Sequence, residues 1–192
     1  MTKLNKLTVI NIFLWILNIT CVNAQTNTII LPIKSITQNN VFNVRQITKD
    51  HLGFLWIATQ EGLIRFDSKN SDEYNTYSYT NHMIESADVR SIIIDSATNS
   101  TWFISSGGAL NAVDLITGNV VFRKNFSTGD LNGVKLFTKL CSYKNTIYLA
   151  SNRGVYVFNK ENKTLKAENI INHSSLDIDD AIIIGDIFFV LV

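Results

Sequence analysis

Acidic side chains are the first candidates for chemistry in this sequence. Glu61 and Asp67 flank a short apolar stretch, and Asp177, Asp179 and Asp180 lie close together. Carboxylates at such spacings can coordinate a cation. Acidic residues in the turns of β proteins, however, mostly accept hydrogen bonds from nearby backbone groups and keep the surface soluble. We therefore predict no metal-binding residue among them.

The histidines likewise form no pattern that indicates a catalytic or metal-binding site. His51, His82 and His173 are far apart in the chain, and each has turn-like polar neighbours, which favours solvated loop positions over catalytic or metal-binding roles. The sequence also has no phosphate-binding glycine loop, zinc-ligand spacing or nucleophile elbow. We therefore predict no catalytic, cofactor-binding or metal-binding residue and no cofactor. The ligand-binding residues are unknown at this stage.

Composition indicates a folded chain that is rich in strands. Of the 192 residues, 46% are hydrophobic and 17% are charged, which argues against disorder. Apolar runs such as Ile92–Ile94 and Ile182–Ile184 are short and β-branched. Nine Gly and one Pro leave most turns to Gly, Asn and Asp.

Residues 1–24 have the three-part plan of a secretory signal peptide. Lys3 and Lys6 precede an apolar stretch from Leu7 to Val22, and small residues follow up to Ala24. An uncleaved membrane anchor and a lipid-modified Cys21 are the alternatives, but polar residues interrupt a stretch that is barely long enough to span a bilayer. We expect cleavage after Ala24 and export of residues 25–192 to the periplasm or the extracellular space.

The mature chain is close to neutral. The 17 basic and 16 acidic residues become 15 and 16, because the signal peptide carries two lysines and no acid. Nucleic acid and anionic membrane surfaces are not expected partners, since both require a basic face. Cys21 leaves with the signal peptide, so Cys141 has no disulfide partner in the chain and is expected to be a small buried apolar residue.

An internal repeat organises the mature chain. Trp56, Trp102 and Tyr148 are separated by intervals of 46 residues, and glycines 62, 108 and 154 keep the same intervals. Self-similarity at such a period is typical of solenoids and propellers. Parallel β-helix coils and leucine-rich repeats have shorter periods, and helical repeats would show a 3.6-residue periodicity that this chain lacks.

Each repeat divides into four strands. The second strand carries the aromatic residue, and a tight turn closed by the glycine leads to the third. The expected first strands are Val41–Thr48, Val89–Ile94 and Phe137–Ser142. The expected third strands are Leu63–Phe66, Leu110–Val113 and Val155–Phe158, and the expected fourth strands are Glu73–Tyr79, Val120–Lys124 and Thr164–Glu168.

Four antiparallel strands in about 46 residues match a propeller blade. We therefore predict an all-β chain that forms a partial β-propeller, with blades at about residues 37–80, 86–125 and 135–170 and the start of a fourth at 178–192. The aromatic residues of the repeat are expected to fill the space between adjacent blades.

Both ends of the chain fit this plan. Thr28–Ile36 resembles a strand that precedes the first repeat, and Ala181–Gly185 with Asp186–Val192 resembles the first two strands of a fourth, with Phe188 in the aromatic position. Propellers contain four to eight blades. We therefore expect the chain to be a piece of a longer protein or to assemble with another molecule.

The segment Val44–Asp67 resembles the two-component-regulator propeller repeat. It contains Asp50, Gly53, a Leu-Trp-Ile centred on Trp56, and Gly-Leu followed by Arg-Phe-Asp. Ala58 stands where that family more often has Gly. The second and third repeats keep mainly the aromatic, the Gly and the Asp or Asn positions.

The resemblance implies the periplasmic sensor region of a bacterial hybrid histidine kinase. In that family two propellers often precede a β-sandwich, a membrane helix in the inner membrane and the kinase, and the ligands come from polysaccharide breakdown. The implied function is an extracytoplasmic ligand-sensing fragment that is not itself an enzyme. The implied partners are a carbohydrate, the missing C-terminal propeller, membrane and kinase regions of the same protein, and a second copy in a homodimer. An exported propeller enzyme of lyase, lactonase or quinoprotein type and a glycan- or protein-binding scaffold are the alternatives.

Overall fold

The computed structural model describes residues 43–126, 134, 136–166 and 178–192. The chain divides into two compact units, residues 1–32 and 33–192, and only the second contains described residues. The predicted signal peptide, the predicted strand Thr28–Ile36, His173 and Asp177 lie outside the described residues.

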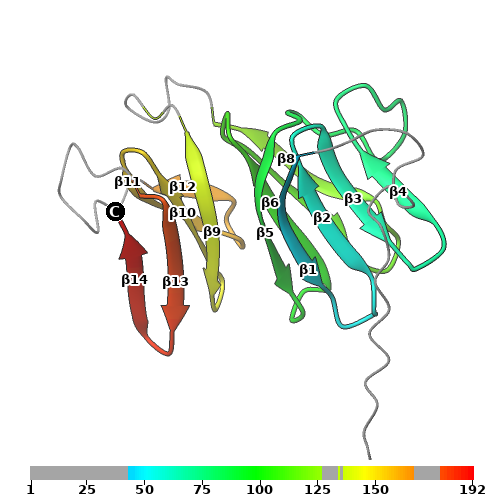
Figure 1. The fold of residues 1–192 in the computed structure, drawn as a ribbon. Coiled ribbons are helices and arrows are strands. Elements are labelled where there is room, and N and C mark those ends of the chain that lie inside the picture. Colours follow the sequence, from blue (N-terminus) through cyan, green and yellow to red (C-terminus); the bar gives the residue numbers. More distant parts are fainter. Residues whose placement is uncertain (1–42, 127–133, 135, 167–177) are drawn as a thin grey trace, which may run out of the picture. The chain divides into compact units, whose positions relative to one another are not determined.

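All regular structure in the described residues is β-strand (Figure 1). The first sheet comprises β1 (Val44–Lys49), β2 (Leu55–Thr59), β3 (Gly62–Phe66) and β4 (Ser71–Tyr74). The second comprises β5 (Val89–Asp95), β6 (Ser100–Ser105), β7 (Ala109–Asp114) and β8 (Val120–Asn125). The third comprises β9 (Phe137–Tyr143), β10 (Thr146–Ser151), β11 (Gly154–Asn159) and β12 (Thr164–Lys166), and β13 (Asp180–Ile184) pairs with β14 (Ile187–Leu191).

Each sheet is an antiparallel meander in which every strand pairs with the next one along the chain. We call the three four-stranded sheets blades 1 to 3. The prediction of an all-β chain with three four-stranded sheets and two strands of a fourth is confirmed. Among the described residues no helix has the length and apolarity that crossing a bilayer requires.

The predicted fourth strand of blade 1, Glu73–Tyr79, is wrong. The observed β4 is Ser71–Tyr74, because the turn at Asp67 is compact: the Asp67 carboxylate accepts hydrogen bonds from the backbone N–H groups of Lys69 and Asn70. The return strand therefore begins and ends earlier than the predicted range. Tyr77 and Tyr79, which lie in the predicted range but beyond β4, are exposed.

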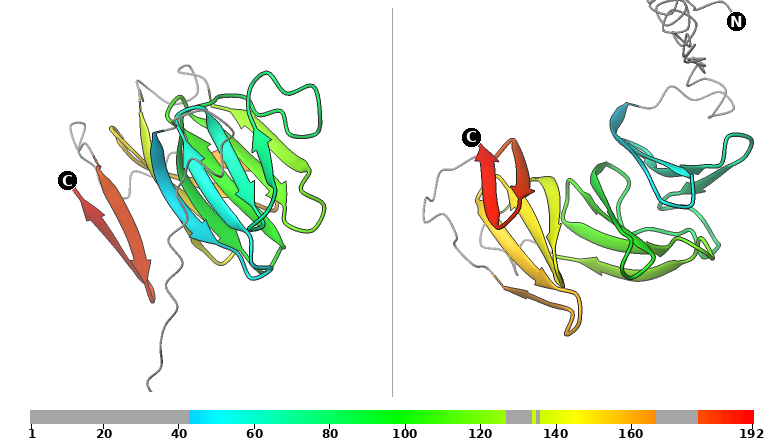
Figure 2. Two further views of the ribbon diagram at one scale, coloured as in Figure 1. Left: turned by 45° about the vertical axis from the view of Figure 1, so that its right-hand side comes forward. Right: turned by 90° about the horizontal axis from the view of Figure 1, so that it is seen from below.

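The first strands of the sheets lie next to one another. β1 contacts β5, β5 contacts β9, and β9 contacts β13, whereas the fourth strands make no comparable contact among the described residues. Figure 2 shows the sheets joined along these first strands and diverging toward their last ones. In a propeller the innermost strands are the ones that approach each other in this way around the central channel. We therefore call β1, β5, β9 and β13 the inner strands.

The hydrophobic cores lie between consecutive sheets. Trp56 packs with Phe103 and Val113 of blade 2, and Trp102 packs with Leu149 and Phe158 of blade 3. Tyr148 packs against Phe188 of β14, with ring centroids 5.4 Å apart. The predicted role of the repeated aromatic residue, to fill the space between blades, is confirmed.

The repeated glycine follows from backbone geometry. Gly62, Gly108 and Gly154 have φ values of 145°, 90° and 113°, a region that L side chains rarely adopt. In blades 1 and 3 a hydroxyl closes the same turn, because Thr59 donates to the Gly62 carbonyl and Ser151 donates to the Gly154 carbonyl. The hairpin predicted between the second and third strands is confirmed.

Candidate functional site

The acidic residues Glu61 and Asp67, which lie close together in the sequence, are far apart in the structure. Glu61 lies in the turn before β3, and Asp67 lies at the other end of β3, so they do not form a common cation site. The Asp67 carboxylate is occupied by backbone N–H groups of Asn70 and Lys69, and these bonds hold its pKa below the ordinary value. Nowhere in the described residues do three or more His, Cys, Asp or Glu side chains gather as metal ligands.

Asp180 takes part in a link between sheets. Its carboxylate lies 3.0 Å from the Lys139 ammonium group of β9. Burial raises the pKa of this carboxyl, but the hydrogen bonds from Lys139 and from the Ala181 N–H outweigh that effect and hold the pKa below its ordinary value. Asp180 therefore fastens β13 to blade 3 and leaves no acidic cluster with Asp179 that could bind a metal among the described residues.

The two described histidines differ from each other. His51 is exposed in the turn after β1, as predicted. His82 is half-buried, and its ring lies 4.6 Å from the Tyr74 ring, centroid to centroid. His82 lies in a turn of the long connection after β4, which folds back onto the sheet it leaves, so the ring is only partly exposed to solvent.

Asp50 is a buried structural residue whose role its position in the sequence does not reveal. Its carboxylate accepts hydrogen bonds from the N–H groups of Leu52 and Phe54 at 2.9 and 3.0 Å and from the Trp56 indole at 2.7 Å. One side chain thus shapes the turn after β1 and orients the aromatic residue of the repeat. The Asp, Gly and Trp of the sequence motif therefore form a folding unit: their hydrogen bonds shape this turn.

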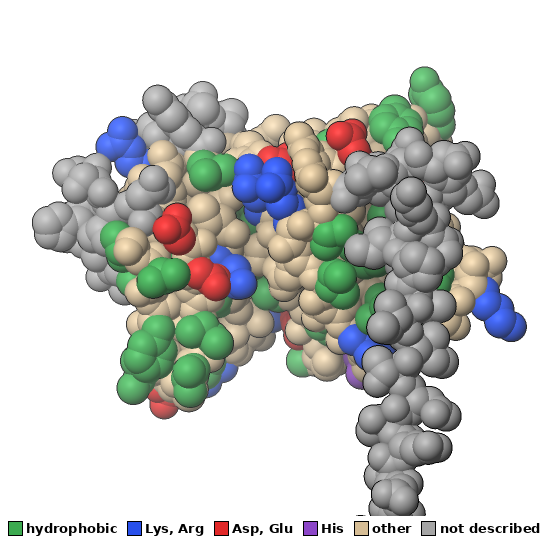
Figure 3. All heavy atoms as spheres, viewed as in Figure 1, with side chains coloured by type: hydrophobic (Ala, Val, Ile, Leu, Met, Phe, Trp, Pro, Cys, Tyr) green, Lys and Arg blue, Asp and Glu red, His purple; other side chains and the backbone are tan. Residues whose placement is uncertain are grey.

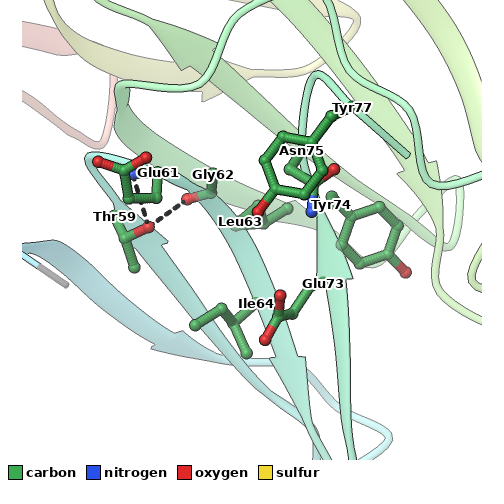
Figure 4. A pocket seen from close by; sticks show the side chains of 9 residues that line it. All are labelled: Thr59, Glu61, Gly62, Leu63, Ile64, Glu73, Tyr74, Asn75 and Tyr77. Atoms are coloured by element: carbon green, nitrogen blue, oxygen red, sulfur yellow. Dashed lines mark hydrogen bonds between the residues drawn. The ribbon is translucent and has the colours of Figure 1, made fainter. Parts of the chain in front are cut away.

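The pocket in blade 1 is too small for a saccharide (Figure 4). Thr59, Glu61 and Gly62 lie at one end of it, joined by the hydrogen bonds of the turn, and Asn75 and Tyr77 lie at the other. Its volume is about 10 Å³, roughly that of a single water site. The Asn75 Oδ1 atom is buried without a hydrogen-bond partner in the described residues, and a water molecule would satisfy it.

Polar residues on the inner strands connect each blade to the next. Gln46 donates from Nε2 to the Ile92 carbonyl at 2.8 Å and accepts from the Ile92 N–H at 3.0 Å. The Ser91 hydroxyl accepts from the Leu140 N–H at 3.0 Å. These bonds run between β1, β5 and β9, so the alignment of the blades depends on them.

A charged cluster lies at the start of β1 and β5. Arg45 Nε is 3.3 Å from one carboxylate oxygen of Asp88, and Arg90 Nη2 is 3.0 Å from the other. All three side chains are partly exposed. Figure 3, which looks onto the inner strands, shows basic side chains beside an acidic one near the start of β5. Because it combines charge with access, this cluster is the candidate functional site.

A different alignment of the repeat would have revealed this cluster. Asp50 lies six residues before Trp56, whereas Asp95 lies seven residues before Trp102, so inner-strand positions recur at 45 residues where the aromatic positions recur at 46. Arg45 and Arg90 are 45 residues apart, as are Asp50 and Asp95. Alignment on the aromatic residue alone places Arg45 opposite Ser91 and hides the equivalence.

Comparisons with known proteins find similarity in structure. No family model matches this sequence, and no curated protein matches it either. The extracellular domain of the hybrid two-component system BT3049 from B. thetaiotaomicron matches with a TM-score of 0.65 and 21% identity, over 80% of this chain and 22% of that one. The extracellular domain of the one-component system BT4673 from the same organism matches with a TM-score of 0.59 and 15% identity, over 79% and 20%. Sqt1 from Saccharomyces cerevisiae matches with a TM-score of 0.54 and 14% identity, over 72% and 37%.

The chain therefore spans about a fifth of the two bacterial domains that it resembles. At these identities the likeness establishes architecture. Three four-stranded meanders joined along their first strands, together with these matches, identify the fold as part of a β-propeller.

Proposed function

We propose that this chain is the N-terminal, extracytoplasmic ligand-sensing part of a two-component signalling protein, and that its ligand derives from a glycan. The observation that carries the proposal is the fold shared with the extracellular domain of the hybrid system BT3049 over 80% of this chain. The two-component-regulator pattern in Val44–Asp67 supports it from the sequence.

The proposed mechanism is differential binding. A ligand that binds one arrangement of the blades more tightly shifts the equilibrium toward that arrangement, and the shift is passed to the rest of the protein. The chain itself performs no bond-making step in this scheme. Residues 1–24 act as the export signal, and the histidine kinase activity belongs to a region beyond the inner membrane.

The open face of β13 and β14 supports the proposal that further sheets of the same protein continue the fold. Ile183 and Phe188 face blade 3, whereas the alternate side chains point away from it and are about half exposed or more. These exposed side chains are Ile182, Ile184, Ile187, Phe189 and Leu191. A strand pair that is apolar on both faces requires a sheet on each side. We propose that two more strands complete this blade and that the next blade covers it.

Reconstitution of the intact protein in liposomes tests the proposal. Autophosphorylation is measured with a panel of oligosaccharides from plant and host polysaccharides, and the matched control lacks residues 43–192. We expect one glycan class to change the phosphorylation rate of the intact protein and to leave the control unchanged. A protein that binds no glycan, or whose phosphorylation never responds to one, would contradict the proposal.

A further inference from the structure

Arg45 and Arg90 occupy equivalent irregularities in two neighbouring inner strands. In β1 the pairing shifts between Val44, opposite Thr59, and Gln46, opposite Ala58, so that Arg45 is an extra residue. In β5 the same shift leaves Arg90 between Val89 and Ser91. β-Bulges of this kind redirect a side chain and are common beside binding sites.

The charges of this cluster do not balance. Asp88 receives Arg45 Nε at 3.3 Å and Arg90 Nε and Nη2 at 3.2 and 3.0 Å. Two guanidinium groups share one carboxylate, so the cluster keeps one positive charge. Within the described part of the chain no other acceptor contacts either group, which leaves Arg45 both Nη groups and Arg90 its Nη1 for a ligand.

The fold does not require arginine at this position. In the third blade the corresponding bulge residue is Thr138, whose hydroxyl donates to the Ile178 carbonyl at 2.7 Å. In blades 1 and 2 the contacts between inner strands are made by the following residues, Gln46 and Ser91. The Arg45 and Arg90 side chains are 31% and 30% exposed. Ion pairs at such exposure contribute little to stability.

We propose that Arg45 and Arg90, held in place by Asp88, bind an anionic group of the ligand, a carboxylate or a sulfate ester, on the side of the inner strands. Guanidinium groups are suited to both because their paired N–H donors match two oxygens of the anion. Asp88 sets the spacing of the two groups and neutralises one of their two positive charges. This inference rests on the proposed function and narrows the ligand to an acidic saccharide.

Calorimetric titration of the intact protein with matched ligands tests the inference. One pair is oligogalacturonate and its methyl ester, and the other is a sulfated disaccharide and its desulfated form. We expect one acidic member to bind at least about tenfold more tightly than its neutral counterpart, in line with the energy of charged hydrogen bonds. Whether the carboxylate or the sulfate series shows the difference identifies the group. Equal affinity within both pairs would overturn the inference.

Variants distinguish binding at this cluster from a general effect of the protein's positive charge. Arg45→Gln and Arg90→Gln are each expected to weaken acidic-ligand binding about tenfold without changing the unfolding midpoint. Arg123→Gln on the exposed strand β8 removes the same charge elsewhere and is expected to leave binding unchanged. If Arg45→Gln and Arg90→Gln bind like the unaltered protein, the inference fails while the proposed function stands. If the intact protein binds no saccharide, acidic or neutral, both fail.

Discussion

The interface between blades 1 and 2 and the interface between blade 3 and β13–β14 are built on the same plan and differ in completeness. Trp56 is fully buried, and Asp50 holds its indole. Tyr148 occupies the equivalent position but is only half-buried against Phe188. The aromatic residue therefore stabilises the protein only to the extent that the following sheet buries its ring.

Arg65 makes further contacts across the interface between blades 1 and 2. Its guanidinium lies 3.7 Å from the Phe54 ring centroid and donates to the Leu115 carbonyl of blade 2 at 2.8 Å. The Tyr74 hydroxyl donates to the Gly118 carbonyl of the same blade, and burial raises the pKa of this phenol well above its ordinary value. Two side-chain hydrogen bonds from blade 1 to the turn after β7 thus join the blades away from the inner strands as well.

The largest expected effect tests the aromatic position directly. Trp56→Ala should destabilise the protein by about 3–5 kcal/mol, because a fully buried ring is lost from a packed core. Tyr148→Ala should cost about 1–2 kcal/mol, because the ring is partly exposed. Urea unfolding of the two variants provides the measurement, and equal losses would show that the interfaces do not differ in completeness.

The glycines of two hairpin turns, one in blade 1 and one between β13 and β14, test the same difference between the two interfaces. A Cβ atom on Gly62 would lie 2.2 Å from the Tyr74 carbonyl oxygen, whereas a Cβ on Gly185 between β13 and β14 would meet nothing within 4 Å. Gly62→Ala should therefore cost about 3 kcal/mol, from the clash and the positive φ together. Gly185→Ala should cost about 1 kcal/mol from its φ of 61° alone. Thermal unfolding distinguishes these values, and comparable shifts would refute the assigned clash.

A buried ion pair between blades 2 and 3 is expected to have an intermediate effect. Lys160 pairs with Asp95, and both side chains are 9% exposed. Burial raises the pKa of Asp95, but the hydrogen bonds from Lys160 and Thr98 outweigh it and the pKa lies below its ordinary 3.8. Asp95→Asn should cost about 2 kcal/mol at neutral pH, because it leaves the ammonium group without its counter-charge.

The pH dependence of that variant has a definite sign. A carboxyl with a depressed pKa contributes stability above its unfolded value of 3.8, and the contribution is lost as the pH falls through the lower folded value. The gap between unaltered protein and Asp95→Asn should thus narrow below about pH 4. A gap that stays constant down to pH 2 would show that the ion pair is not its source.

The Lys139–Asp180 pair should give the smallest effect. Its side chains are 31% and 55% exposed, so Asp180→Asn should cost about 0.5 kcal/mol at low salt. At 1 M NaCl that difference should fall to nearly zero, since the Debye length is then about 3 Å. A salt-independent loss of more than 1 kcal/mol would mean that β13 depends on this pair more than the exposed geometry implies.

The sequence alone predicts those parts of the fold in which the local backbone or packing allows only one type of residue. Positive φ requires glycine at positions 62, 108 and 154, and the inter-blade space requires a large ring at 56, 102 and 148, so both recur at equal intervals. The fourth strand of blade 1 was predicted too late in the chain because the length of the turn before it depends on hydrogen bonds to the Asp67 carboxylate, which the residue types alone do not show.

The candidate site escaped prediction for a different reason. Arg45, Asp88 and Arg90 come together only through two bulges and the packing of β1 on β5, neither of which alternation in the sequence reveals. Contacts such as Lys160 with Asp95 join residues of different blades, and their spacing follows no repeat.

The direction in which the aromatic residues face has a consequence for how the protein is made. Trp56, Trp102 and Tyr148 each pack onto the sheet that comes later in the chain. Because a chain is synthesised from its N-terminus, each sheet must wait for about 46 further residues before its ring is covered. The most recently synthesised sheet therefore always exposes an apolar face with an uncovered aromatic ring. This favours addition of sheets in chain order and makes a pause between two of them the moment of greatest risk of aggregation.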